Sequence, residues 1–175
     1  MASTVPVDLY DLPPEFTEFR DTIRQIVREQ VAPRAAEIDA KAEYPWDLRR
    51  LFAEQDLLGL PFSAEHGGTG TGALMLNIAI EEIAKACAST ALILMLQDLG
   101  TLPIRLHGSP EMQERFLPRC ATGELAPAFA LSEPEAGSDP GGMITRAVRD
   151  GDEWVVTGTK TVSYTHLTLP TTPYV

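Results

Sequence analysis

The chain has 175 residues, of which 44% are hydrophobic and 22% are charged, and this composition suits a soluble globular protein with a sizeable core. Its formal net charge is −11, from 25 acidic and 14 basic residues. No cluster of lysine and arginine offers the contacts that nucleic acids need, so we expect no nucleic-acid partner and interpret the acidity as an aid to solubility.

The N-terminal stretch MASTVPVDLYDLPPEF lacks the basic and apolar regions of a secretory signal, and the longest apolar run, residues 91–96, is too short to span a bilayer. The two cysteines form no C-x-x-C pair, and Cys87 lies in an apolar helical stretch that favours a buried thiol. The three histidines have no metal-ligand spacing. We predict a reduced, cytoplasmic protein with no bound metal.

Residues 14 to about 117 follow a helical pattern. A first amphipathic segment begins at Pro13–Pro14 and is interrupted by Pro33, because proline cannot continue a helix. A second segment begins after Pro45 and ends before Gly59. The residues expected to face inwards in these two segments are Phe16, Phe19, Ile23, Ile26, Val27, Leu48, Leu51 and Phe52.

The next helix is expected over residues 73–87, with Leu74, Ile78, Ile80, Ile83 and Ala84 inside and Glu81, Glu82 and Lys85 outside. Residues 89–99 are apolar nearly all round, which predicts a helix buried between others. Ser109-Pro110-Glu111 has the pattern of a helix start, and we expect a short helix from there to about Leu117.

After Gly123 the pattern changes to that of strands, which are expected at residues 126–131, 143–149 and 153–157. Asp150-Gly151 predicts a type I′ hairpin turn between the last two. The fold class is therefore α+β, with an all-α helical domain followed by the first strands of an incomplete, β-barrel-like domain.

HGGTGTG at residues 66–72 has the glycines of a nucleotide-binding loop but follows a helical segment, so we interpret it as an interhelical loop. ALSEPEAGSD at residues 130–139 follows an expected strand and offers hydroxyls and backbone N–H groups to a planar polar ligand. The alternative for this second stretch is a polar surface loop, and we expect Glu133 and Glu135 to be solvated and ionised.

ALSEPEAGSD, the DG hairpin and the following WVVTGTK together resemble the flavin-binding signature of the acyl-CoA dehydrogenase family. EEIAKACASTALILMLQDLGTLPI and GSPEMQERFLPRCATGE resemble the family's central buried helix and the turn that follows it. The resemblance covers roughly residues 10–161, with Glu135 standing where the family often has glycine.

The resemblance implies an N-terminal fragment of an enzyme of fatty acid metabolism that binds FAD and forms homotetramers or dimers. It implies that the backbone of Phe129, Ala130, Leu131 and Ser132 and the Ser132 hydroxyl contact the flavin. Ser138 would lie near the CoA part of an acyl-CoA substrate. On the central helix, Met95 and Leu99 would line the acyl pocket or belong to the core, and we expect Leu92 to be core.

In this family a glutamate of a C-terminal bundle removes the α-proton, the flavin takes the β-hydrogen as hydride, and electrons pass to an electron-transfer flavoprotein. We therefore assign no catalytic residue and expect this chain to be inactive alone. Two alternatives are a flavin monooxygenase or nitroalkane oxidase on the same fold, and a non-catalytic helical interaction module.

The expected organisation is a helical domain at 1–124, the start of a β domain at 125–161 and a tail at 162–175. The tail is rich in Thr, Pro and Leu and carries Pro170 and Pro173 where a central strand is expected. We therefore expect the tail to be foreign to the parent protein and to make few core contacts.

Overall fold

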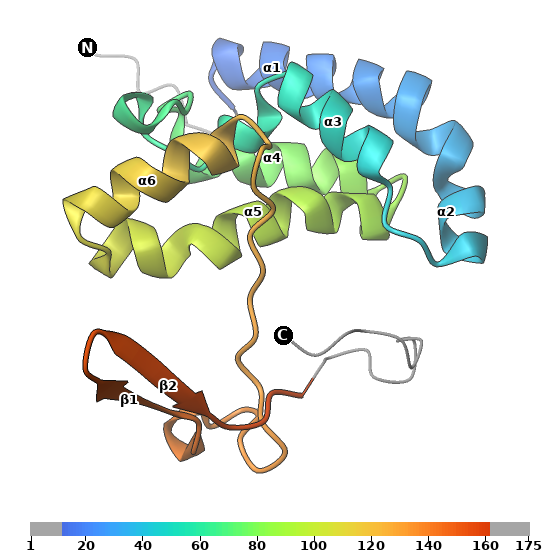
Figure 1. Ribbon diagram of the computed structural model, residues 1–175. Coiled ribbons are helices and arrows are strands. Elements are labelled where there is room, and N and C mark those ends of the chain that lie inside the picture. Colours follow the sequence, from blue (N-terminus) through green and yellow to red (C-terminus); the bar gives the residue numbers. More distant parts are fainter. Residues whose placement is uncertain (1–11, 162–175) are drawn as a thin grey trace, which may run out of the picture. The chain divides into compact units, whose positions relative to one another are not determined.

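The computed structural model describes residues 12–161, so the predictions for the tail at 162–175 lie outside the described residues (Figure 1). The chain divides between Ala128 and Phe129 into two compact units. We call them the helical unit, up to Ala128, and the hairpin unit, from Phe129 onwards, and describe each by itself. The predicted α+β class, with helices first and an open pair of strands after them, is confirmed.

The α-helices of the helical unit are α1 (Pro14–Ile26), α2 (Ala35–Lys41), α3 (Trp46–Glu54), α4 (Gly72–Ala84), α5 (Ala88–His107) and α6 (Pro110–Ala121). Between α1 and α2 the chain passes through a π turn, Val27–Val31, and a 3-10 turn, Ala32–Arg34. The interruption predicted at Pro33 is therefore confirmed. Two further 3-10 turns, Leu57–Gly59 and Ala64–His66, lie between α3 and α4.

Helix α6 begins as its sequence predicts. The Ser109 hydroxyl accepts a hydrogen bond from the Met112 N–H at 3.2 Å, and Pro110 occupies the first helical position, where no N–H is needed. The helix extends four residues past the predicted end at Leu117, to Ala121, and includes Pro118.

The core of the helical unit forms where α4 and α5 run side by side and α1 packs on α4 (Figure 1). Ile23, Val31, Phe52, Ile83 and Leu94 are each at most 1% exposed. The inward positions predicted for α1 and α3 are confirmed except for Phe16, which is half-buried: Leu48 and Phe52 are buried, and Phe19, Ile26 and Leu51 pack against the same core.

Helix α4 buries Ile78 and Ile83 as predicted but differs from the prediction at three other positions. Leu74, expected inside, is 48% exposed, and Ala84 is exposed as well. Glu82, expected outside, is 5% exposed. Apolar periodicity placed Glu82 on the solvent face, but an acidic side chain can be buried where cations of neighbouring residues neutralise it.

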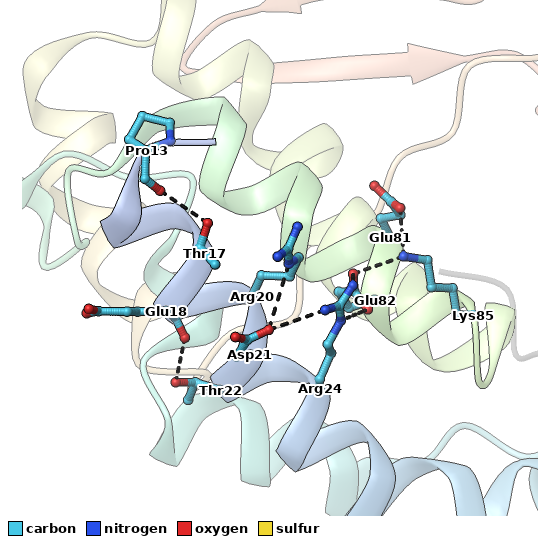
Figure 2. A network of polar contacts seen from close by, with 10 residues as sticks. All are labelled: Pro13, Thr17, Glu18, Arg20, Asp21, Thr22, Arg24, Glu81, Glu82 and Lys85. Carbon is cyan, nitrogen blue, oxygen red and sulfur yellow. Dashed lines mark hydrogen bonds and ion pairs between the residues drawn. The ribbon is translucent and has the colours of Figure 1, made fainter. Parts of the chain in front are cut away.

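Glu82 has these cations in Arg24 and Lys85 (Figure 2). Arg24 of α1 donates from Nε to Oε2 at 3.0 Å and from Nη2 to Oε1 at 3.1 Å, and Lys85 Nζ donates to Oε1 at 2.9 Å. Burial alone would raise the pKa of Glu82, but the hydrogen bonds and charges of Arg24 and Lys85 hold it below its ordinary value. The ion pair thereby joins α1 to α4.

A second buried polar group, Gln97, connects α5 to three other segments. Its side chain is 1% exposed, and Nε2 donates to the carbonyls of Leu58 at 3.1 Å and Cys120 at 2.6 Å. Its Oε1 accepts from Arg49 of α3 at 3.4 Å, and the same guanidinium donates to the Leu125 carbonyl at 2.7 Å. Because its donors and acceptor have partners, Gln97 fixes the orientation of α5 at little cost.

Helix α5 is longer than the predicted 89–99 and is not buried all round. With Gln97 facing the core, Met95 on another face is 40% exposed, and Leu92 and Leu99 are half-buried. The prediction that Leu92 is plain core is therefore wrong. The three residues share one apolar face because their spacing of three and four residues brings them into line.

The glycine-rich stretch 66–72 lies between α3 and α4, so its interpretation as an interhelical loop is confirmed. Its backbone donors are used inside the protein: Gly68 N–H bonds the Ser63 carbonyl at 2.9 Å and Gly70 N–H bonds the Phe62 carbonyl at 3.1 Å. Any side chain at Gly68 would collide with Phe62, whose carbonyl oxygen would lie 2.2 Å from its Cβ. The glycines serve packing, since these N–H groups are not free for a phosphate.

The hairpin unit contains β1 (Arg146–Asp150) and β2 (Glu153–Thr157), paired antiparallel with Asp150 opposite Glu153. The turn is therefore Gly151–Asp152, one residue later than predicted. Only Gly151 has a positive φ, at 60°, which is the pattern of a type II′ turn and corrects the predicted type I′. The expected strand at 126–131 is extended chain, because within residues 12–161 no strand pairs with it.

Cys87 is buried as predicted, with the Thr90 hydroxyl donating to its sulfur at 3.1 Å. Across residues 12–161, every helix is too short or too polar to cross a membrane.

Replacing Glu82 with Gln tests the buried ion pair. The substitution removes the charge that neutralises Arg24 and Lys85, and we expect the chain to lose about 1–2 kcal/mol of stability, since Arg24 remains half-exposed to water. Glu81→Gln is the matched control, because Glu81 is exposed and its one ion pair within residues 12–161 is with Lys85, and it should cost about 0.5 kcal/mol or less. Urea unfolding followed by circular dichroism measures both, and equal effects would contradict the assignment.

Candidate functional site

Phe129–Ser132, the first part of the predicted signature, is an extended segment at the start of the hairpin unit. Phe129 is 38% and Leu131 40% exposed, while Ser132 is half-buried. Within the described part of the chain, no hydrogen bond reaches the backbone N–H groups of these four residues or the Ser132 hydroxyl. The segment therefore offers a row of unused donors to a polar ligand.

A tight turn follows, with Pro134 and Glu135 at its tip. Glu133 N–H donates to the Ala136 carbonyl at 2.9 Å, and Ala136 N–H donates back to the Glu133 carbonyl at 3.2 Å. Pro134 stabilises this turn because its ring fixes φ at the first tip position. The turn sends the Glu133 side chain inwards and leaves Glu135 exposed.

Glu133 is the buried acid of this unit, with 2% of its side chain exposed, so the expectation that it is solvated is wrong. Its carboxylate accepts hydrogen bonds from Ile144 N–H at 2.7 Å, from Thr145 N–H at 3.1 Å and from Lys160 Nζ at 2.9 Å. Hydrogen bonding by Thr145, Ile144 and Lys160 lowers the pKa of Glu133 to about 2. The side chain is therefore ionised at neutral pH and does not act as a proton donor there.

Lys160 and Thr161, just after β2, return to the extended segment. Lys160 Nζ donates to the Leu131 carbonyl at 2.9 Å as well as to Glu133, and Thr161 N–H donates to the Ser132 carbonyl at 2.8 Å. These bonds join residues that are 27 to 29 positions apart in the sequence. They fix the carbonyl groups of Leu131 and Ser132, while no bond within the described residues uses the N–H groups of the segment.

Ser138 and Asp139 end the signature. Ser138 is exposed, and Asp139 Oδ1 accepts a hydrogen bond from Gly141 N–H at 3.0 Å at the start of the 3-10 turn Pro140–Gly142. Ser138 therefore lies in the same unit as Phe129–Ser132, while Met95 and Leu99 lie on the apolar face of α5 in the helical unit.

The roles of Glu133 and Lys160 were missed from the sequence. One signal in the sequence could have pointed to Lys160. The chain has three lysines, and Lys160 is the last of them, so it is the one lysine in the sequence after Lys85. Such a lysine is a candidate partner for an acid that directly follows an apolar run, and the two could form a buried ion pair. No rule of sequence spacing, however, predicts a contact between two residues that are 27 positions apart.

The model of the acyl-CoA dehydrogenase N-terminal domain matches residues 13–124. The chain therefore belongs to the acyl-CoA dehydrogenase family. The predicted family resemblance is thus confirmed.

Relatives extend the similarity into the hairpin unit. The chain is 48% identical over 142 residues to cyclohex-1-ene-1-carbonyl-CoA dehydrogenase of Geobacter metallireducens, covering 80% of this chain and 37% of that protein. It is 44% identical over 144 residues to cyclohexane-1-carbonyl-CoA dehydrogenase of the same organism, covering 82% and 38%. The chain thus spans less than half the length of these relatives.

A solved structure is similar as well. Glutaryl-CoA dehydrogenase from Mycobacterium smegmatis, in complex with FADH2, matches with a TM-score of 0.79 and 31% identity, covering 85% of this chain and 39% of that one.

The low pKa of Glu133 predicts a pH dependence of the hairpin unit. A group whose pKa is lower in the folded state stabilises that state above its ordinary pKa, here 4.5, and the stabilisation is lost as the pH falls from there through about 2. The amide NMR signals of Ile144 and Thr145 should titrate near pH 2 and should not do so in Glu133→Gln. A midpoint near 4.5 would show that the carboxylate is solvated.

Proposed function

We propose that this chain is the N-terminal part of an FAD-dependent acyl-CoA dehydrogenase. The observation that carries the proposal is the extended segment Phe129–Ser132, whose backbone donors are unused within the described residues, in a chain of this family. The relatives named as dehydrogenases of cyclic acyl-CoA thioesters and the FADH2-bound neighbour support it.

The residues present fit a flavin. Its isoalloxazine edge carries carbonyl and nitrogen acceptors, and the N–H groups of Phe129–Ser132 with the Ser132 hydroxyl are donors of the matching kind. Leu131 and Phe129 are exposed enough to contact the ring of a bound cofactor. When bound, FAD supplies the hydride acceptor for the oxidation of an acyl thioester.

The remaining roles belong to binding. Ser138 is exposed and can donate to the CoA part of the substrate, and Met95 and Leu99 offer an apolar surface to the acyl group. We assign no catalytic base among the described residues, because Glu133 is held as an ionised, buried acceptor. An electron-transfer flavoprotein as acceptor, a homodimeric or homotetrameric assembly and a cytoplasmic location complete the proposal.

A flavin monooxygenase or nitroalkane oxidase on the same fold is the alternative that keeps the cofactor. The relatives favour the dehydrogenase, since they are named for the dehydrogenation of acyl-CoA thioesters. A helical module without a cofactor is disfavoured by the relatives, which are named as acyl-CoA dehydrogenases, and by the FADH2-bound neighbour.

Purified full-length protein carrying this segment should be yellow, and acyl-CoA should bleach its flavin absorbance without oxygen. The substrate panel should include cyclohex-1-ene-1-carbonyl-CoA, cyclohexane-1-carbonyl-CoA and linear acyl-CoA thioesters, with nitroalkanes as the test of the alternative. Bleaching by a nitroalkane and by none of the thioesters would overturn the proposed activity, and a colourless protein that takes up no FAD would overturn the cofactor.

Replacing Ser132 with Ala in that protein removes one hydroxyl donor to the flavin. We expect a loss of about 1 kcal/mol in FAD binding, or about fivefold in Kd, together with a shift in the flavin absorbance spectrum. Ser138→Ala is the companion variant and should raise KM for the acyl-CoA while leaving FAD binding unchanged. An unchanged Kd and spectrum in Ser132→Ala would remove Ser132 from the site.

A further inference from the structure

Glu133 and Lys160 form a clamp on the extended segment. Lys160 Nζ lies 2.9 Å from both the Leu131 carbonyl oxygen and Glu133 Oε1, so one ammonium group bonds the segment and the buried acid together. The carboxylate in turn holds the Ile144 and Thr145 amides, which lead into β1. The clamp therefore fixes the segment against both ends of the hairpin.

The bond from Lys160 to Leu131 has a consequence for the next residue. The Leu131 carbonyl and the Ser132 N–H belong to the same planar peptide group. A cation bonded to the carbonyl oxygen polarises that group and makes its N–H a stronger donor. The Ser132 N–H has no partner within the described residues, so this added donor strength is available to a ligand.

We propose that Glu133 and Lys160 are positioning residues for the flavin: they hold Leu131 and Ser132 in place and strengthen the Ser132 N–H as a donor to the isoalloxazine edge. The inference rests on the proposed function. Glu133 contributes by neutralising and locating Lys160, which is 30% exposed and would otherwise sample many positions. Neither residue touches the reacting atoms.

A positioning role for the clamp and a purely structural role lead to different expected measurements. If the contacts of Glu133 and Lys160 only stabilised the hairpin, their removal would change the unfolding temperature and the affinity for FAD. It would not change the properties of the flavin once it is bound. A clamp that strengthens one donor changes the bound flavin itself, because such donors stabilise negative charge on the reduced ring.

The test uses the full-length holoprotein and its Lys160→Met and Glu133→Gln variants. Lys160→Met keeps the Glu133 bonds to Ile144 and Thr145 and so separates the clamp from folding. The matched control is Glu135→Gln, which removes an exposed carboxylate two residues from Glu133. We expect Kd for FAD, measured by quenching of flavin fluorescence, to rise about tenfold in the first two variants and to stay unchanged in the control.

The decisive measurements are the midpoint potential and the absorbance spectrum of the bound flavin at saturating FAD. Lys160→Met should lower its midpoint potential and shift its absorbance, and Lys160→Arg, which keeps the cation, should restore much of both. A potential and spectrum like those of Glu135→Gln in a folded, FAD-saturated Lys160→Met protein would overturn the inference. If the unaltered protein binds no FAD, the proposed function fails instead, so the two failures are distinct.

Discussion

The hairpin unit depends on the burial of one ionised carboxylate. All ten residues of β1 and β2 are exposed, and among the described residues of this unit only Glu133 and Ala136 are buried. A two-stranded hairpin that buries no apolar face is marginal in water, so polar bonds must hold it to the preceding segment. Glu133 provides them, since its carboxylate collects two amides and one ammonium group.

The helical unit is stabilised in a different way from the hairpin unit. Its apolar core supplies most of the stability, and its buried polar groups determine which faces of the helices meet. Glu82 joins α4 to α1 through Arg24, and Gln97 joins α5 to α3 and α6 through Arg49 and the Cys120 carbonyl. The orientation of α5 that follows leaves Met95 and Leu99 on a partly exposed face, where the proposed acyl group would lie.

What could be predicted from the sequence was mostly local. The spacing of Phe19, Ile23 and Phe52 indicated their helices, Ser109 marked the start of α6, and residues 153–157 were predicted as a strand. The errors concern partners distant in the sequence. Glu82 was placed outside because Arg24, the one of its two cations that lies on another helix, is 58 residues away, and Glu133 was expected in solvent because Lys160 lies 27 residues away. The strand expected at 126–131 had the right composition, but strand formation needs a neighbour, and none is present within the described residues.

We expect the segment fixed by Glu133 and Lys160 to present to a flavin the N–H groups that are unused within the described residues. A crystal structure of the full-length protein with FAD tests it most directly. We predict the isoalloxazine edge within hydrogen-bonding distance of the Ser132 N–H and hydroxyl, with Lys160 still bonded to the Leu131 carbonyl and to Glu133. A flavin bound elsewhere, or a segment whose N–H groups are bonded to another strand, would contradict the account.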